Sequence, residues 1–489
     1  HRDSVVLPRE RILADVAVLG NEHRTSRLLP GIGHRAVAAV AIPDDQQVLG
    51  SLGVSALAAS GLLAVFLALA RTPGVNRFLP AGDFFRTVLV AHVDLSVLVW
   101  FVSFAGAIWS LNSTMRALAL GRAALALAVL GSIAIAVAPF VDPTLPIMAN
   151  YIPVIDGPVF KGGLALFGAG AALLVLRGLF ASPLVGVRLD GAGALRFGVN
   201  AAIVAGAVAL MAFAWSLMAV PRDLEARAWY ELAFWGGGHV LQFAWTLLLL
   251  VAWLLLADAS GVRVPISPRV VALLFGIQLA AVFATTLVYL AYDVTSVEHH
   301  RLQTWLMRIG GALAIPVVAA AVALGLARRA RSGPVPAQAR PLLAALVVSL
   351  ALFGTGGVIG FLIEGSNVKI PAHYHGAIVG VTIAMMGLAY WLLPRLGAAA
   401  PRVKLAVWQS VLYGVGQLMH ISGLLWSGGY GVQRKVAGGE QVLRSGSEIA
   451  AMGLMGAGGL VAVIGGVLFV VVVVLAVRER PRGATARSD

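Results

Sequence analysis

Twelve long apolar runs constrain this sequence more than any other feature. A transmembrane helix needs about 20 predominantly apolar residues, and each run reaches or approaches that length. The chain is 59% hydrophobic and only 12% charged, whereas a soluble domain carries about 25% charged residues. We therefore predict an all-α polytopic membrane protein with twelve transmembrane helices, at 51–70, 84–111, 117–139, 160–180, 193–219, 229–257, 268–291, 303–327, 340–363, 372–394, 403–427 and 446–477.

The twelve runs form one block without an internal domain boundary. Pro, Gly and Arg mark the short connections between them, and none is long enough to act as a linker. We predict a single membrane domain over 51–477, preceded by an extramembrane segment at 1–50 and followed by a tail at 478–489. The sequence indicates no function for residues 1–50.

The net charge of +14 comes largely from Lys and Arg in short segments between the apolar runs. That distribution is typical of membrane topology and argues against a nucleic-acid partner. The N-terminal segment, the loops after even-numbered runs and the C-terminal tail hold 24 of these residues, against 12 in the other loops. By the positive-inside rule, we expect both termini in the cytoplasm and the protein in the inner (cytoplasmic) membrane.

The sequence contains no cysteine. This excludes disulfides, thiolate-bound iron–sulfur clusters, a Cys-ligated copper centre and covalently attached c-type haem from the chain itself. Electron carriers of those kinds have to lie on a partner. We expect an electron-donating subunit, a cytochrome or a cupredoxin, on the outer face.

Seven of the ten histidines lie within or beside the apolar runs. Each even-numbered run begins at the outer face, so these histidines fall in the outer half of the membrane although they are far apart in sequence. Any one of them alone could be a hydrogen-bonded packing residue. Polar groups at membrane depth are costly and often functional, and imidazole is the commonest metal ligand, so the set predicts metal binding. Its members are His92, His239, His299, His300, His373, His375 and His420, the last without an assigned role.

His373 and His375 open the tenth run, in the sequence Pro-Ala-His-Tyr-His-Gly. Residues two apart on a helix project roughly 200° from each other, so this helix presents imidazoles to two different flat cofactors. His92 would share one haem with either His375 or His373. With two axial ligands that haem has no open position and would transfer electrons. The remaining histidine would hold a second haem on one side only.

His239, His299 and His300 would face the open side of that second haem. Three imidazoles suit copper, zinc or iron, and an open haem iron beside a second metal is a place to bind and reduce a diatomic molecule. The glycines at 236–238, directly before His239, have two interpretations. They clear space for the macrocycle, or they are the small packing residues that are common in membrane helices.

Five motifs sit on these runs in a fixed order. They are His92 in the second run, Trp-Gly-Gly-Gly-His239 in the sixth, His299-His300 after the seventh, Ala-His373-Tyr-His375 in the tenth, and Gly-Val-Gln-Arg434-Lys435 after the eleventh. Together with twelve runs, the pattern resembles catalytic subunit I of the haem–copper oxidase superfamily over nearly the whole membrane region.

The resemblance implies a role for each motif residue. Arg434 and Lys435 stand where the family keeps two basic residues near haem propionates, a pairing that is physically sensible; a solvated pair in a loop is the alternative. The remaining assignments are His92 and His375 to a low-spin haem, His373 to a high-spin haem, and His239, His299 and His300 to the second metal.

Departures from the common oxidases indicate the substrate. Those oxidases place a Tyr four residues after the sixth-run His and a Glu two residues after it, where this chain has Phe243 and Leu241. The eighth run, Leu302 to Arg329, has no Lys for a cytoplasmic proton path. Protons would then arrive from the outer side, as expected of nitric oxide reductases in this superfamily. Carboxylates available there are Glu231, Asp293, Glu298 and Glu364.

Phe243 also departs from the cytochrome c-dependent nitric oxide reductases, which carry a Glu at that position as an additional iron ligand. Without that ligand, a three-His copper site is favoured over iron. The chain would then be an atypical, copper-containing member. The haems would be b- or a-type; the ligand motifs do not distinguish the two types.

Three further side chains are candidates for the chemistry. Gln242, one turn from His239, could hydrogen-bond an intermediate or act as a packing amide. Glu298 could orient an imidazole beside it or face solvent. Tyr292, with Tyr289, is a candidate because C-family oxidases take a cross-linked Tyr from the seventh run; interfacial aromatics are the alternative.

The leading hypothesis is a nitric oxide reductase that takes electrons from an external donor. The alternative within the superfamily is an O2-reducing terminal oxidase, a cytochrome c or quinol oxidase subunit I, that uses a Tyr of the seventh run. A third hypothesis, from a different functional class, is a membrane transporter without redox chemistry. Absence of Soret absorption from the purified protein would favour it.

Overall fold

The computed structural model describes residues 43–80, 82–142, 144–185 and 190–479. Most of the predicted extramembrane segment, residues 1–42, and residues 480–489 of the predicted tail lie outside the described residues. The first helix, α3 (Pro43–Arg71), begins before the predicted boundary at residue 50. The fold is otherwise all-α, as predicted, apart from one short hairpin.

Within the described ranges, 11 helices are long and apolar enough to cross a membrane by length and composition. The predicted runs match them closely; the seventh, predicted at 268–291, is Pro268–Ala291. The predicted eleventh run forms helix α15 (Val403–Gly429), which packs along α16 (Gly446–Arg478). It is not among the 11 because Gln, Ser, Tyr, His and Gly make it less apolar, so its role as the twelfth span stays a prediction.

Helix is the structure that a chain in lipid can adopt while satisfying each backbone group within one segment. Two spans contain short π-helical stretches, where the backbone departs locally from α geometry. The other α- and π-helices are α4 (Asp83–Val93), η2 (Asp94–Val99), α5 (Trp100–Asn112), α6 (Leu118–Val141), α7 (Pro158–Ala181), α8 (Gly191–Ala219), α9 (Ala226–Ala259), α10 (Pro268–Ala291), α11 (Val297–Leu306), η3 (Met307–Gly311), α12 (Ala314–Ala330), α13 (Arg340–Phe361) and α14 (Lys369–Leu392). Four short 3-10 helices are η1 (Asn76–Phe78), η4 (Ala337–Ala339), η5 (Leu393–Leu396) and η6 (Gly438–Glu440).

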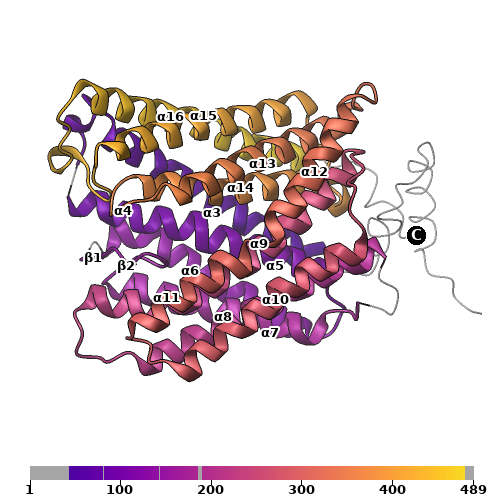
Figure 1. The fold of residues 1–489 in the computed structure, drawn as a ribbon, viewed down its shortest axis with the longest axis horizontal. Coiled ribbons are helices and arrows are strands. Elements are labelled where there is room, and N and C mark those ends of the chain that lie inside the picture. Colours follow the sequence, from indigo (N-terminus) through magenta and orange to yellow (C-terminus); the bar gives the residue numbers. More distant parts are fainter. Residues whose placement is uncertain (1–42, 81, 143, 186–189, 480–489) are drawn as a thin grey trace, which may run out of the picture.

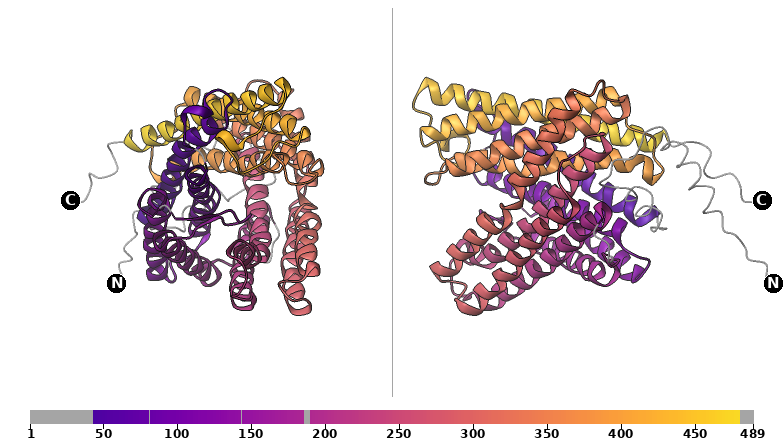
Figure 2. Two further views of the ribbon diagram at one scale, coloured as in Figure 1. Left: turned by 90° about the vertical axis from the view of Figure 1, so that its left-hand side faces the viewer. Right: turned by 45° about the vertical axis from the view of Figure 1, so that its right-hand side comes forward.

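The helices form one bundle in which α13, α14, α15 and α16 pack together on one side (Figure 1; Figure 2). The spans that contain α9 and α14 are its most enclosed, with 78% of their apolar windows buried inside the bundle, against 28% for the spans of α3 and α16. The two most enclosed spans carry the His239 and His373–His375 motifs. The sequence therefore places its metal-binding candidates at the centre of the fold.

Glycine allows α13 and α14 to approach closely. A Cβ added to Gly376 would lie 2.4 Å from the Cα of Gly356, and one added to Gly356 would lie 2.3 Å from the backbone nitrogen of Ala377. Small residues allow this close approach between membrane helices. Because Gly376 directly follows His375, this contact fixes the position of α14 next to its two histidines.

A hairpin inserts between the helices where α4, α9 and α14 begin, an end of the bundle that we call the histidine end. Strand β1 (Pro146–Ile147) pairs antiparallel with β2 (Val154–Ile155), in the register Pro146 with Ile155 and Ile147 with Val154. The strands contact α4, α7 and α9, and Val154 and Ile155 are fully buried. The hairpin is thus part of the core at this end, to the left in Figure 1.

Candidate haem and metal centre

His239 of α9 and the His299–His300 pair of α11 meet around the indole of Trp235. The Trp235 ring lies 4.7 Å from the His239 ring and 4.6 Å from the His300 ring, between centroids. Its Nε1 donates to the backbone oxygen of His300 at 3.3 Å, which ties α9 to α11. The three histidines predicted to share a metal therefore come together from two helices.

A turn before α11 places the histidine pair. The Asp293 carboxylate accepts hydrogen bonds from the Thr295 backbone nitrogen at 2.8 Å and hydroxyl at 2.6 Å. These bonds lower the pKa of Asp293 below its ordinary value. Ser296 then caps the helix, its Oγ accepting from the His299 nitrogen at 3.1 Å. The turn and the cap thus fix the position of His299 and His300 in the first turn of α11.

The three imidazoles are gathered but do not converge on one point. His299 meets Tyr289 edge-on at 4.7 Å between centroids, while His239 directs Nε2 to the Thr304 hydroxyl at 3.2 Å. Across the residues that the structure describes, no group of three or more His, Cys, Asp or Glu side chains has a metal-binding arrangement. The three-His metal site stays a prediction.

The two histidines of α14 point to different neighbours. The Nδ1 of His373 lies 2.7 Å from the backbone oxygen of Gly356 in α13, and a Cβ on Gly360 would come within 2.9 Å of that nitrogen. The His375 ring instead lies 4.6 Å from the ring of His420 in α15. One helix presents imidazoles in two directions, as the 200° spacing requires.

Five of the histidines share a hydrogen bond that fixes which ring nitrogen carries the proton. In each, Nδ1 lies within hydrogen-bond distance of a backbone carbonyl oxygen, and because a carbonyl only accepts, Nδ1 carries the proton. The lone pair is then on Nε2, the ring atom that could ligate a metal; in His239 this atom faces the Thr304 hydroxyl. The pairs are His92 with Ser60 (3.0 Å), His239 with Trp235 (2.8 Å), His300 with Ser296 (3.4 Å), His373 with Gly356 (2.7 Å) and His420 with Met455 (2.9 Å).

His420, which has no predicted role, lies with His92 and His375. Its ring lies against the ring of His375, and His92 and His420 both act electrostatically on His375. His92 of α4, His375 of α14 and His420 of α15 therefore gather in one region. The structure brings together His92 and His375, the pair expected to share a haem, and places a third imidazole against them.

The two basic residues after α15 bind the hairpin. Arg434 donates from Nη2 to the Asn150 side-chain oxygen at 3.2 Å, and Lys435 donates from Nζ to the Met148 oxygen at 2.6 Å. Burial lowers the pKa of Lys435 to about 8. Both residues are part of a polar cluster at the histidine end, so neither is merely solvated.

The three predicted catalytic side chains fall in different environments. Gln242 donates from Nε2 to the Tyr151 hydroxyl at 3.2 Å, beside His239. Glu298 is exposed, and within the described residues no hydrogen bond or ion pair is found for it. Tyr292 ends α10 and is 40% exposed, whereas Tyr289 is 6% exposed and touches His299. The geometry favours Gln242 and Tyr289 over the other two.

Comparison with known proteins decides the family. Residues 49–468 match the family described as cytochrome c and quinol oxidase polypeptide I. The chain belongs to this family.

Its relatives include an uncharacterized protein of Rickettsia prowazekii (strain Madrid E), 28% identical over 86% of this chain and 93% of that protein. An uncharacterized protein of Aquifex aeolicus (strain VF5) is 28% identical over 71% of this chain and 84% of its own length. Among solved structures, a heme-copper terminal oxidase dimer superposes with a TM-score of 0.65 at 18% identity, covering 88% of this chain and 84% of that one.

Cytochrome c and quinol oxidase polypeptides I carry haem and a metal centre, and the residues present here fit such groups. His299 is 1% exposed, and neither of its ring nitrogens has a partner among the described residues. Burying an imidazole without a hydrogen bond costs free energy, and a metal ion bound to one ring nitrogen of His299 would offset that cost. The carbonyl-held rings of His92 and His373 likewise leave Nε2 available for a haem iron.

The glycine triplet at 236–238 clears space for aromatic side chains of this protein. An added Cβ would lie 2.0 Å from the Tyr289 hydroxyl at Gly236, 2.4 Å from Phe213 at Gly237 and 2.2 Å from Tyr151 at Gly238. Of the two sequence interpretations, the structure supports packing. Two of the side chains that pack against these glycines touch histidines: Tyr289 contacts His299, and Tyr151 contacts His239.

Two residues at this end were missed from the sequence. Asp94 is 1% exposed, and neither carboxylate oxygen has a partner within the described ranges; its signal was a carboxylate in the middle of an apolar run. Tyr151 lies in a loop between runs, and no sequence signal pointed to it.

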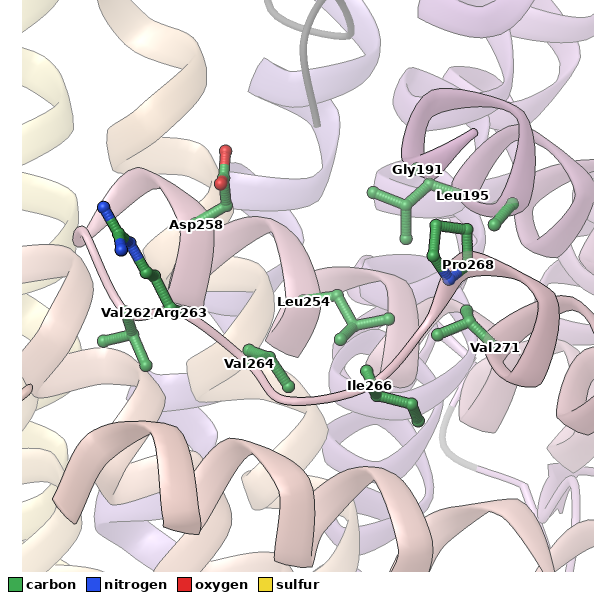
Figure 3. Close-up of a pocket in the computed structure, with 11 residues that line it drawn as sticks. Gly191, Leu195, Leu254, Asp258, Val262, Arg263, Val264, Ile266, Pro268 and Val271 are labelled. Carbon is green, nitrogen blue, oxygen red and sulfur yellow. The ribbon is translucent and has the colours of Figure 1, made fainter. Parts of the chain in front are cut away.

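One cavity in the described residues lies apart from this site. It measures about 30 Å³ and is lined mostly by apolar side chains, with Asp258 and Arg263 among its lining residues (Figure 3). Asp258 is 19 residues beyond His239 on α9, roughly 28 Å at 1.5 Å per residue. The cavity therefore lies at the opposite end of the bundle.

Proposed function

We propose that this chain is the catalytic subunit of a membrane-bound nitric oxide reductase. Two NO molecules, two electrons and two protons give N2O and water. The histidine end faces the outside of the cytoplasmic membrane. Electrons come from a donor subunit, a cytochrome or a cupredoxin on that face.

The observation that carries this proposal is the apolar wall that α9 forms behind His239. A polar side chain beside it is Gln278, which is fully buried and donates to the Gly311 oxygen at 2.7 Å. Phe243 is 1% exposed and packs against Gly311 of η3. Further along α9, residues 247–250 are leucines that are at most 1% exposed. Protons need titratable or hydrogen-bonding groups to cross such a region, and joining two NO molecules requires no O–O bond cleavage. An apolar wall suits that reaction.

Polar groups at the histidine end support proton entry there. Glu231 accepts two hydrogen bonds from Asn150, from its backbone nitrogen at 3.0 Å and its amide at 2.5 Å. Asn150 precedes Tyr151, which touches His239. Of the four carboxylates predicted on this side, the other three, Asp293, Glu298 and Glu364, are exposed. Glu231 is therefore the residue to which we assign proton entry.

The remaining assignments are those that the resemblance implies. His92 and His375 would hold the low-spin haem, His373 the high-spin haem, and His239, His299 and His300 a non-haem metal. Phe243 offers no ligand atom, so an all-imidazole copper site is favoured over iron. When bound, these groups supply electron transfer and a binding position for NO. Arg434 and Lys435 hold the hairpin tip and would stabilise the anionic propionates of a bound haem.

One observation favours a second candidate, an O2-reducing terminal oxidase. Tyr289 contacts His299 and is held by hydrogen bonds to the Ser216 hydroxyl at 2.9 Å and the Ala212 oxygen at 3.2 Å. A redox-active Tyr of the seventh span would occupy such a position.

Turnover of the purified complex with a reduced donor separates the two candidates. NO and O2 consumption are followed by electrode, N2O by gas chromatography, and bound copper and iron are quantified on the same sample. Fast NO loss to N2O with slow O2 use supports the reductase. Fast O2 reduction, abolished in Tyr289→Phe and retained in a matched Tyr292→Phe variant, would replace it with the oxidase.

A further inference from the structure

Tyr151, at the tip of the β1–β2 hairpin, lies against the predicted metal ligand His239. Their ring centroids are 4.8 Å apart, and the Tyr151 ring also meets Trp235 edge-on at 5.8 Å. Tyr151 is thus an aromatic residue that touches His239 from outside the helices carrying the histidines. No motif in the sequence includes it.

The hairpin tip is fixed on both sides of Tyr151. Asn150, directly before it, is bound by Glu231 of α9 and by Arg434. Lys435 binds the oxygen of Met148. A loop held at these points has little freedom, so the ring is placed over α9 with the precision of a helix residue.

The rest of α9 is shaped to receive this side chain. Gly238 has no Cβ where one would collide with the Tyr151 ring. One turn further, Gln242 donates from Nε2 to the Tyr151 hydroxyl at 3.2 Å. In that bond the hydroxyl accepts, and a phenol has one proton of its own to donate. No acceptor for that proton is found among the described residues.

We propose that Tyr151 is a substrate-contacting residue of this centre. Its hydroxyl, held by Gln242, donates a hydrogen bond to the diatomic ligand bound beside His239. The proposal rests on the proposed function only in requiring that such a ligand binds there. It holds for NO and for O2 alike.

A packing role does not account for the hydroxyl. Phe would fill the same space against Gly238 and His239 but would lack the hydroxyl that Gln242 binds. The side chain is a donor without a protein acceptor.

The test uses carbon monoxide as the probe on the reduced, fully loaded complex. A hydrogen bond to the outer atom of bound CO lowers its stretching frequency, which infrared spectroscopy reads directly. In Tyr151→Phe we expect the main CO band to shift to higher frequency. Loss of one neutral hydrogen bond, about 1 kcal/mol, corresponds to a roughly fivefold faster CO dissociation.

Two further variants complete the experiment. Gln242→Leu removes the group that holds the phenol and is expected to split or broaden the CO band, so it replaces Tyr151→Phe if that variant is not recovered. Tyr430→Phe is the matched control, because Tyr430 ends α15 and is 51% exposed. Its CO band should coincide with that of the wild type.

The outcomes separate this inference from the proposed function. Wild-type CO binding with identical bands in Tyr151→Phe and Gln242→Leu would overturn the role of Tyr151 alone, whichever gas is turned over. Failure of the wild-type complex to bind CO would overturn the binding site itself. A band shift in an enzyme that turns over only O2 would keep Tyr151 and overturn the reductase.

Discussion

Gly238→Ala tests how the helix and the hairpin build the centre together. The added methyl group would lie 2.2 Å from the Tyr151 Cγ and 2.3 Å from Cδ1, far inside van der Waals contact. Overpacking of this kind costs about 1–3 kcal/mol, and losing the Gln242–Tyr151 hydrogen bond adds about 1 kcal/mol. We expect destabilisation of roughly 2–4 kcal/mol from these two terms.

The assay is thermal unfolding of the purified, detergent-solubilised complex, followed by loss of Soret absorption. A lower midpoint is expected for Gly238→Ala. Gly276→Ala in α10 is the control, because a Cβ there meets nothing within 4 Å. Since Ala favours helix over Gly by about 1 kcal/mol, that variant should match or exceed the wild type.

A double-mutant cycle identifies the collision partner. In a Tyr151→Ala background the new methyl group has space, so most of the cost of Gly238→Ala should disappear. An equal loss of stability with and without the Tyr151 side chain would refute the reasoning. It would mean that the helix, and not the hairpin, requires glycine at this position.

Three further changes probe other parts of the site. Glu231→Gln should slow NO reduction at least tenfold, as removal of a proton-transfer group does, in stopped-flow assays where haem reduction is unchanged; the exposed Glu364→Gln should be neutral. His375→Ala should abolish the low-spin haem spectrum, whereas His420→Ala should retain it, and the reverse result would exchange their roles. Asp293→Ala, which unties the turn before α11, should lower the copper content measured by elemental analysis, and full copper retention would contradict that role.

The sequence predicted the helices well because their signal is strong and local. Each apolar run is bounded by Pro, Gly or Arg, so the predicted 268–291 coincides with α10. The sequence also places residues by depth, since position along a run measures distance from the membrane surface. His239, His299 and His300 were grouped on that basis, and the structure brings them together around Trp235.

Depth does not give direction around the helix axis, and there the prediction was weaker. Tyr289 and Tyr292 lie at nearly the same depth, but only the first faces His299. His420 was placed on the correct side without a role, because its contact with His375 depends on how α14 and α15 pack.

Loops were the least predictable part. Strands of two residues have no periodicity to detect, so the hairpin that delivers Tyr151 was not expected. Its position depends on contacts with Glu231, Arg434 and Lys435, which are distant in sequence. Those contacts arise only once the bundle has formed.

The most direct test of the account is the side from which protons are taken during turnover. The complex is reconstituted in proteoliposomes with the donor outside, and pH is followed with one dye inside and one outside while N2O is measured. The account predicts N2O formation with proton uptake from the outer solution and no alkalinisation inside. Internal alkalinisation during turnover, with O2 consumed in place of NO, would contradict it.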